Sequence, residues 1–291
     1  MKLSDDDLNQ LIQRERLSQE HLSKAGSFAS FAPLKYQQPW FKCDKKIILL
    51  MCGNQVGKTT FGVVKMISAA LGCTPPSLGG QIPAKWWDNK CRGKRYLICG
   101  ESYGTSLRDT ILPKMHEFIG PGMLVGTPKK NAQGLDSLFK FSTGATIVIG
   151  SYEQGRDAFE GPVWDGFWGD EPPPQPVFSA VRRGTLARQG FMIITGTPLK
   201  EPWMLDELIL PAQDEDHPSY GTVGFFRASM HDNCLQCSPG VGLIEHFEIE
   251  SFLSTQPPKE RQAREHGDFI DLMGREFTEL DRAIHVIPDI F

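Results

Sequence analysis

The stretch of residues 51–60, MCGNQVGKTT, constrains the fold more than any other part of the chain. It follows an apolar run at 47–50 and precedes a helical pattern. A strand, a glycine loop and a helix in this order form a phosphate-binding P-loop, whose pattern is G-x-x-x-x-G-K-[ST]. The triplet at 57–59 matches the end of that pattern, but its first glycine is replaced by Cys52, and the available glycine is Gly53. The stretch therefore predicts a variant P-loop.

A P-loop binds phosphate through successive backbone N–H groups and through the positive N-terminal end of the following helix. Lys58 would reach the β- and γ-phosphates, and the hydroxyl of Thr59 would ligate Mg²⁺. A turn that merely resembles a P-loop is the alternative. On the first interpretation the nucleotide contacts are Gly53, Asn54, Gln55, Val56, Gly57, Lys58, Thr59 and Thr60.

A pair of acids, Asp170 and Glu171, ends the aromatic stretch at 163–171. If this stretch is a strand of a parallel sheet, both acids lie at the carboxyl edge, where ligands bind in open α/β folds. The first acid can hold Mg²⁺, and the second can orient and deprotonate an attacking water. The alternative is a polar strand end before three consecutive prolines. Together with the P-loop, the pair indicates nucleotide hydrolysis.

A second strand, at 191–194, ends in Thr-Gly-Thr-Pro. The hydroxyl of Thr197 could sense the γ-phosphate or the attacking water, although a simple strand-to-loop turn is the alternative. Phosphoryl transfer also needs a positive charge on the transition state. Arg156 precedes the acidic strand and is our candidate; the rivals are Arg182, Arg183 and Arg188.

The segment 27–41 is aromatic and carries two glutamines ahead of the P-loop strand. A glutamine side chain offers one acceptor and one donor, which suits the edge of an adenine ring. Gln37 is the first candidate for this contact and Gln38 the second. Packing of the segment onto the edge of the sheet is the competing interpretation.

Repeated alternation of strands and helices predicts an α/β fold of the P-loop NTPase kind. The sheet should be mainly parallel with helices on both faces, and a hairpin at 138–150 should add strands at one edge. We expect a helical segment at 1–26, an ATPase domain at 27–266 and a linker at 267–291. The expected strands are 47–52, 95–100, 163–171, 191–194 and 222–228, and the expected helices are 58–71, one starting at Ser102, 175–187, 243–254 and 258–266.

Composition limits the alternatives. The net charge of −4 provides no global basic field, so any nucleic-acid contact must be local or built by several subunits. The seven cysteines form no regular framework, and no apolar run approaches the roughly 20 residues of a membrane span. Cys234 and Cys237 form one C-x-x-C between His231 and His246; without a second matching pair, incidental loop cysteines are the favoured interpretation over zinc ligands.

These motifs together resemble the ATPase domain of the large terminase subunit of tailed bacteriophages. The resemblance covers most of residues 30–290 and is carried by YQQPW, GNQVGKTT, SYEQGRDAFEG, FWGDE, TGTP, the HDN after Met230 and the tail REHGDFIDLMGREFTELDRAIHVI. A P-loop that lacks its first glycine is usual in that family. The resemblance implies that Gln37 or Gln38 contacts adenine, that Thr197 belongs to a coupling motif, and that the P-loop and acid residues act as described above.

Such proteins couple ATP hydrolysis to the translocation of double-stranded DNA into a preformed capsid, as a ring at the portal. The resemblance therefore implies ATP and Mg²⁺ as cofactors. The expected partners are double-stranded DNA, the portal protein, the small terminase subunit and further copies of this chain, in the host cell cytoplasm and away from membranes. The family normally adds a C-terminal nuclease domain, which should begin where this chain stops, so we do not expect DNA cleavage.

One residue departs from the pattern. Some relatives carry an arginine immediately before the glycine that is Gly161 here, and this chain has Glu160. The arginine finger is therefore open between Arg156 and a residue of a neighbouring subunit. The competing functions are a helicase-like ATPase, a nucleotide-binding scaffold with little turnover, and a small-molecule kinase with a lid at 73–92.

Overall fold

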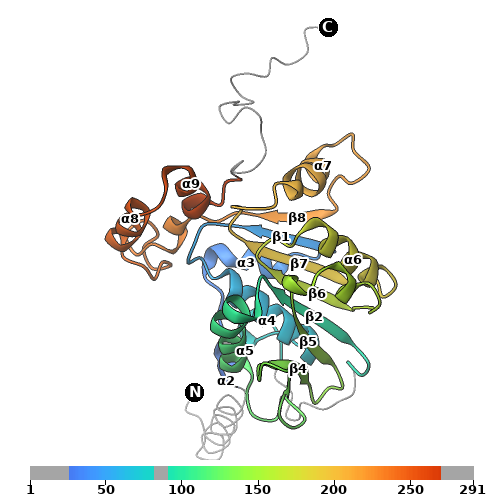
Figure 1. Cartoon of the computed structure of the whole chain (residues 1–291). Coiled ribbons are helices and arrows are strands. Elements are labelled where there is room, and N and C mark those ends of the chain that lie inside the picture. The colour runs from blue at the N-terminus through green and yellow to red at the C-terminus, as the bar shows by residue number, and fades with distance from the viewer. Residues whose placement is uncertain (1–25, 82–90, 270–291) are drawn as a thin grey trace, which may run out of the picture.

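The structure is a computed structural model that describes residues 26–81 and 91–269 (Figure 1). The helix expected near the start of the chain and the tail beyond residue 269 lie outside this range, as does the middle of the loop at 73–92. The domain boundaries at 26 and 267 therefore stay predictions.

An eight-stranded sheet forms the centre of the molecule, in the order β3-β4-β5-β2-β6-β7-β1-β8. Six neighbouring strands run parallel, in the sheet order β5, β2, β6, β7, β1 and β8. At one edge of the sheet, β4 pairs antiparallel with β5, and β3 pairs antiparallel with β4. This arrangement confirms the predicted α/β fold with its edge hairpin. The strands are β1 (Ile47–Met51), β2 (Arg95–Gly100), β3 (Lys129–Lys130), β4 (Asp136–Lys140), β5 (Thr146–Ser151), β6 (Gly166–Asp170), β7 (Phe191–Gly196) and β8 (Val223–Phe226).

Helices cover both faces of the sheet (Figure 1). The α-helices are α2 (Gly26–Ser30), α3 (Gln38–Lys42), α4 (Lys58–Leu71), α5 (Leu112–Phe118), α6 (Gln175–Leu186), α7 (Leu210–Gln213), α8 (His246–Ser254) and α9 (Pro258–His266). Shorter or wider helical turns are η1 (Lys35–Gln37), η2 (Pro76–Leu78), η3 (Tyr103–Ile111), η4 (Tyr152–Gln154), η5 (Arg156–Phe159), η6 (Leu205–Ile209) and η7 (Met230–Asn233). As predicted, Ser102 caps its helix, because its side chain accepts the N–H of Thr105.

Alternation along each strand divides the core into two layers. In β1, Ile48 and Leu50 belong to the cluster that contains α4 and α5, whereas Leu49 and Met51 belong to the cluster that contains α6. Helix α4 lies close against the sheet because Gly62 has no side chain; a Cβ there would collide with the ring of Trp168. The P-loop helix is thereby held directly over the acidic strand β6.

The structure adds elements that the sequence did not predict. Residues 35–42 form helical turns, η6 and α7 form a further helical segment at 205–213, and β3 pairs with β4. No helix within 26–81 and 91–269 combines the length and apolar character that a bilayer crossing demands.

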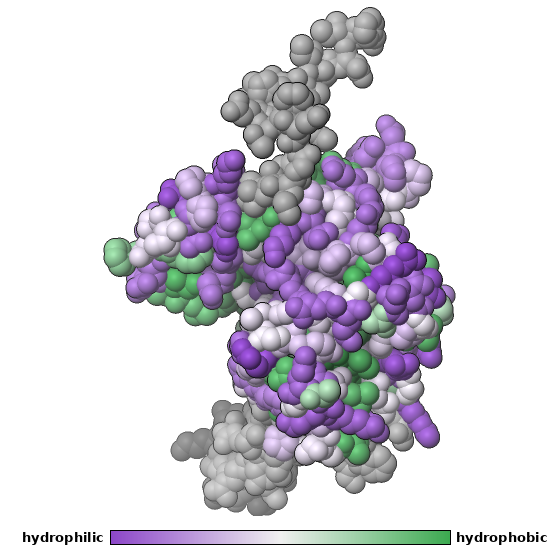
Figure 2. Space-filling view, viewed as in Figure 1, coloured by the Kyte–Doolittle hydropathy of each residue, from purple (hydrophilic) through white to green (hydrophobic). Residues whose placement is uncertain are grey.

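Residues 230–266, comprising η7, α8 and α9, form what we call the C-terminal lobe, at the left of Figure 1. Its own core is small: Met230, Cys234, Ile249 and Leu253 are its buried members. In Figure 2 green, apolar surface gathers on this lobe, and Leu243 and Phe247 are 70% and 74% exposed. The lobe therefore relies less on apolar burial than the sheet does.

Candidate functional site

The P-loop adopts a conformation that requires its second glycine. Gly57 has a φ of 84° and directly precedes α4, and Gln55 also has a positive φ, of 57°. A Cβ on Gly57 would come within 2.5 Å of the side-chain nitrogen of Gln37. Both this close contact and the positive φ therefore disfavour any larger residue at the position. The loop therefore turns tightly enough to aim its backbone at one point ahead of α4.

The backbone N–H groups of the loop fall into two sets. Gly53 donates to the carbonyl of Ala228 at 2.8 Å, and Asn54 donates to the carbonyl of Arg264 at 2.6 Å. The N–H groups of residues 55–60 donate to no acceptor in the described part of the chain. The second set is the one that suits phosphate oxygens, whereas the first set joins the loop to the segment after β8 and to α9 of the C-terminal lobe.

Lys58 lies along the loop. Its Nζ donates to the carbonyl of Gly53 at 2.7 Å, to that of Cys52 at 3.1 Å and to the Thr197 hydroxyl at 3.1 Å. Burial lowers the pKa of Lys58, while the nearby carboxylate of Glu171 opposes that shift. The ammonium group is thus held where the loop, β6 and β7 meet.

A chain of hydrogen bonds fixes Asp170 across the sheet. Thr59 donates to one carboxylate oxygen at 3.3 Å, and Thr195 donates to the other at 2.8 Å. The indole of Trp168 in turn donates to the Thr195 hydroxyl at 2.9 Å. Thr195 lies on β7, the strand between β1 and β6, and its hydroxyl links the carboxylate of Asp170 to the buried ring of Trp168. Burial raises the pKa of Asp170, and the Thr195 hydrogen bond opposes that shift.

The hydroxyl of Thr59 and the carboxylate of Asp170 form an oxygen pair of the kind that Mg²⁺ prefers. Their 3.3 Å separation brings together two residues predicted from separate motifs 111 positions apart in the sequence. The donor set therefore fits the predicted metal.

Glu171 has an unusual backbone, with a φ of 68°. Such conformations are strained in residues other than glycine and concentrate at functional sites. Its N–H donates to the Thr195 carbonyl at 2.6 Å, and its own carbonyl accepts the Tyr152 hydroxyl at 2.8 Å. Its carboxylate accepts the N–H of Thr197 at 3.2 Å. Burial, and next the charge of Asp170, raise the pKa of Glu171 to about 7, against the opposing charge of Lys58.

Thr197 connects the other residues of the site. Besides receiving the Lys58 ammonium and donating its N–H to Glu171, it donates its hydroxyl to the side-chain oxygen of Asn54 at 2.9 Å. One residue at the end of β7 therefore touches the P-loop, its lysine and the second acid at once.

A cavity of about 250 Å³ opens beside Glu171. Its lining residues are Asn54, Glu101, Glu171, Pro172, Thr197, Leu199, Lys200 and Arg264. Two cavities of about 700 Å³ each lie at the opposite, amino ends of β1 and β7, around Asp44 and Lys45, and one of about 280 Å³ lies between the loop and the C-terminal lobe, around Gln55 and Met230. None of these three has Glu171 or Thr197 in its lining, so the cavity beside Glu171 is the candidate site.

The predicted arginine lies apart from that cavity. Arg156 is in η5, its side chain is 61% exposed, and its Nε donates to Glu160 at 2.6 Å. The basic residues that line the cavity are Lys200 and Arg264, which the sequence did not single out. Each is ion-paired, Lys200 with Glu101 and Arg264 with Glu260. Lys200 follows the TGTP turn by two residues and Arg264 begins the tail segment quoted above, but neither stretch has a pattern that marks its basic residue as part of a site.

The two glutamines differ clearly in position. Gln37 is buried against the loop: its side-chain nitrogen donates to the Val56 carbonyl at 2.8 Å, and its side-chain oxygen accepts the N–H of Leu34 at 2.9 Å. Gln38 is exposed at the start of α3. Of the pair, Gln37 is the one in contact with the P-loop.

Comparisons with known proteins agree with this geometry. A variant of the Thermus phage P74-26 large terminase ATPase domain superposes with a TM-score of 0.55 at 13% identity, covering 84% of this chain and 97% of that one. The large terminase of the thermophilic bacteriophage D6E, in complex with ADP, gives a TM-score of 0.53 at 15% identity, covering 79% and 52%. This chain thus spans about half of the D6E protein.

No curated protein sequence matches significantly. The family described as "Terminase large subunit, T4likevirus-type, N-terminal" matches residues 49–277, well over half of the chain. The match includes the P-loop, the acid pair and the C-terminal lobe. The chain therefore belongs to the T4likevirus-type large terminase subunit family, and it contains the N-terminal domain of that family.

Proposed function

We propose that the chain hydrolyses ATP with Mg²⁺ and uses the energy to drive double-stranded DNA into a procapsid. The observation that carries the proposal is the meeting of Glu171, Thr197 and Lys58 beside one cavity at the carboxyl edge of the sheet. A nucleotide-binding scaffold needs no carboxylate on a strained backbone, partly buried, whose pKa is raised to about 7.

The phosphate groups would bind to the N–H groups of residues 55–60, ahead of α4. Lys58 would exchange its contacts with the loop carbonyls for phosphate oxygens. Thr59 and Asp170 would hold Mg²⁺, which when bound neutralises charge on the phosphates. Gln37 is the preferred adenine contact and Gln38 the alternative, since Gln37 already lies against the loop.

Glu171 is proposed as the general base that orients and deprotonates water. A pKa near 7 suits this role, because a base works best when its pKa is close to the working pH. Thr197 would report the state of the γ-phosphate, since it is bonded to the base, to Lys58 and to Asn54. Hydrolysis would change these contacts together.

Arg156 is proposed as an arginine finger that acts on a neighbouring subunit. Its side chain is exposed and lies outside the lining of its own cavity. Hydrolysis should then rise faster than linearly with protein concentration, and Arg156→Ala should remove that excess. A rate per chain that is independent of concentration and survives Arg156→Ala would exclude the role.

The remaining assignments also rest on family membership. We propose a homo-oligomeric ring that contacts double-stranded DNA, the portal protein and the small terminase subunit in the host cytoplasm. Because the net charge is −4, the DNA contacts must be local or be formed by assembled subunits. That residues 267–291 form a linker toward a nuclease domain stays a prediction.

The proposal is tested by Glu171→Gln, with phosphate release and nucleotide binding measured on the same preparations. Loss of a general base costs about 10²–10⁴-fold in turnover, while the phosphate cradle is unchanged. We expect such a loss with nucleotide affinity retained.

The matched control is Glu101→Gln, which changes a carboxylate in the lining of the same cavity that pairs with Lys200. It should keep most of the turnover. Equal losses in the two variants would show that Glu171 contributes only charge, and full turnover of Glu171→Gln would refute the assignment. Stimulation of wild-type turnover by double-stranded DNA would support the translocase; no response with DNA, portal and procapsid present would favour the scaffold.

A further inference from the structure

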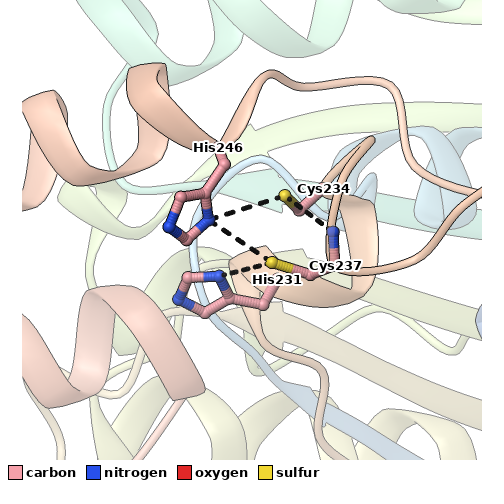
Figure 3. A group of neighbouring side chains, drawn as sticks. All are labelled: His231, Cys234, Cys237 and His246. Carbon is pink, nitrogen blue, oxygen red and sulfur yellow. Dashed lines mark hydrogen bonds between the residues drawn. The ribbon is translucent and has the colours of Figure 1, made fainter.

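Four potential metal ligands converge in the C-terminal lobe, away from the acid pair. They are His231, Cys234, Cys237 and His246, and Figure 3 shows their side chains pointing toward one another. His231 lies in η7, the cysteines in the following loop, and His246 is the first residue of α8. All four ligand atoms lie within 4.8 Å of one another.

Three of the six spacings between these atoms match the edges of a small tetrahedron. The Sγ of Cys237 is 3.6 Å from Nδ1 of His231 and 3.3 Å from Nδ1 of His246, and the Sγ of Cys234 is 3.8 Å from the same His246 nitrogen. Zinc bonds of about 2.3 Å to sulfur and about 2.0 Å to nitrogen give tetrahedral edges of roughly 3.3–3.8 Å. A zinc ion at the centre would need only small movements of the ligands.

The surroundings of the ligands also suit a metal. Zinc-bound histidines usually donate their second ring nitrogen to a carboxylate, which fixes the ring. Here Nε2 of His231 is 2.9 Å from Glu265, and Nε2 of His246 is 3.8 Å from Glu250. The N–H of Cys237 donates to the Sγ of Cys234 at 3.3 Å, a contact that stabilises a thiolate. Both histidines therefore present Nδ1 to the centre.

The lobe also has a reason to need a metal. Its own apolar cluster contains four buried residues. One of them is the proposed ligand Cys234, which has no exposed surface. The loop that carries the cysteines is joined to the start of α8 by a parallel bridge between Cys234 and Ile244. Segments with so little core commonly depend on disulfides or metals.

We propose that His231, Cys234, Cys237 and His246 form a structural zinc site. With two thiolates and two imidazoles the coordination shell is complete, which is typical of structural rather than catalytic zinc. The soft sulfur ligands favour zinc over the Mg²⁺ of the phosphate site. The ion would hold η7 to the start of α8 and so fix the shape of the lobe.

Residues next to the proposed zinc ligands contact the P-loop. Asn233, between two ligands, donates its side-chain N–H to the carbonyl of Gln55 at 2.6 Å. Glu265, the partner of His231, has a backbone carbonyl so close to Gly53 that a Cβ on that glycine would collide with it. Zinc would therefore stabilise the loop indirectly, through Asn233 and Glu265, without contacting the nucleotide.

Metal analysis of the whole chain tests the proposal. The protein is purified without a histidine tag or chelator, supplied with zinc, dialysed and assayed for zinc, iron and copper. We expect close to one equivalent of zinc for wild type, and a background level for Cys234→Ser combined with Cys237→Ser. The matched control is Cys43→Ser, a partly exposed cysteine outside the lobe, which should keep the metal.

A wild-type protein without zinc after this treatment would overturn the proposal, and so would a double variant that keeps its zinc. If the double variant fails to fold, metal-free wild type is titrated with Co²⁺. Visible absorption of tetrahedral, thiolate-bound Co²⁺ that zinc then abolishes is the expected result; a spectrum of hydrated Co²⁺ alone would overturn the site. Neither measurement depends on ATP hydrolysis.

Discussion

The carboxyl edge of the sheet and the C-terminal lobe hold their polar side chains by different means. At the edge, Asp170 and Thr195 are buried and joined by hydrogen bonds between strands whose positions the sheet already fixes. In the lobe, two of the four grouped ligands are histidines that are only partly buried, around a core of four residues. The edge is thus shaped by its framework, whereas the lobe takes its shape from local contacts.

The difference predicts where each region fails. Substitutions at the edge should alter the rate of ATP hydrolysis or the stability of the whole domain, because the side chains there are packed into the main core. Changes in the lobe should act on the P-loop from outside, through a few hydrogen bonds. The predictions below start from the largest expected effect.

Lys58→Ala should separate chemistry from the lobe most sharply. Loss of a positive group from a phosphoryl-transfer site costs about 10²–10³-fold in turnover, and here phosphate affinity should fall as well. Zinc content should not change, because Lys58 contacts no residue of the cluster. Lys65→Ala is the control on the same helix, since its ammonium donates to the carbonyl of Phe41 and lies over the ring of Phe61. ATP affinity unchanged by Lys58→Ala would contradict the phosphate-loop assignment.

Thr195→Val should destabilise the whole domain. It leaves the buried indole N–H of Trp168 without its acceptor and takes one donor from Asp170. A buried group left unpaired costs about 1–3 kcal/mol. Urea unfolding measures this loss, and Thr222→Val, at an exposed hydroxyl, should change stability by no more than about 0.5 kcal/mol. Equal stability of the two variants would show that the chain from Trp168 to Asp170 contributes little.

The pH dependence of stability should reveal the protonation of Glu171. Burial raises its pKa from 4.5 to about 7, so the folded state binds the proton more tightly than the unfolded state. The resulting stability is fully present below the unfolded pKa and is lost as pH rises through about 7.

The measurement is the difference in unfolding free energy between wild type and Glu171→Gln, without nucleotide, across that pH range. Taking the difference cancels the other titrating groups. Wild type should lose stability relative to the variant as pH rises. A flat difference would show that the pKa of Glu171 is the same in both states.

Asn233→Ala should give the smallest change and the most informative one. It removes the hydrogen bond from the lobe to the Gln55 carbonyl, which is worth about 0.5–1.5 kcal/mol. Nucleotide affinity should weaken several-fold while zinc content stays at the wild-type level. Ser254→Ala, in the same lobe but away from the loop, is the control. Unchanged affinity would mean that the lobe and the loop are not coupled through this residue.

The sequence predicted the framework well because the framework follows local patterns. Apolar runs bounded by glycine or polar residues marked β1, β2, β6, β7 and β8, and amphipathic spacing marked α4, α6, α8 and α9. The contact of Thr59 with Asp170 was implied as well, since parallel strands bring their carboxyl ends to one edge.

The sequence failed where tertiary contacts decide. Thr195 lies inside an apolar strand, and nothing local shows that it bridges Trp168 and Asp170. The sequence showed the C-x-x-C at 234–237 with a histidine on either side, but only the structure shows that the four ligand atoms lie within 4.8 Å of one another. The helical segment 205–213 was missed because Asp206, Glu207 and Pro211 interrupt its apolar pattern.

The two backbone hydrogen bonds from Gly53 and Asn54 to the carbonyls of Ala228 and Arg264 have a mechanical consequence. They join the start of the P-loop to the residue two positions before the C-terminal lobe and to α9 at its end, and Gly267, just past α9, lies against the backbone of Cys52. The P-loop is therefore in direct backbone contact with the end of α9, close to residue 269 where the described chain ends. Any movement of the loop that breaks these contacts would therefore expose three otherwise packed backbone groups at once, so the loop and the end of α9 are expected to move together.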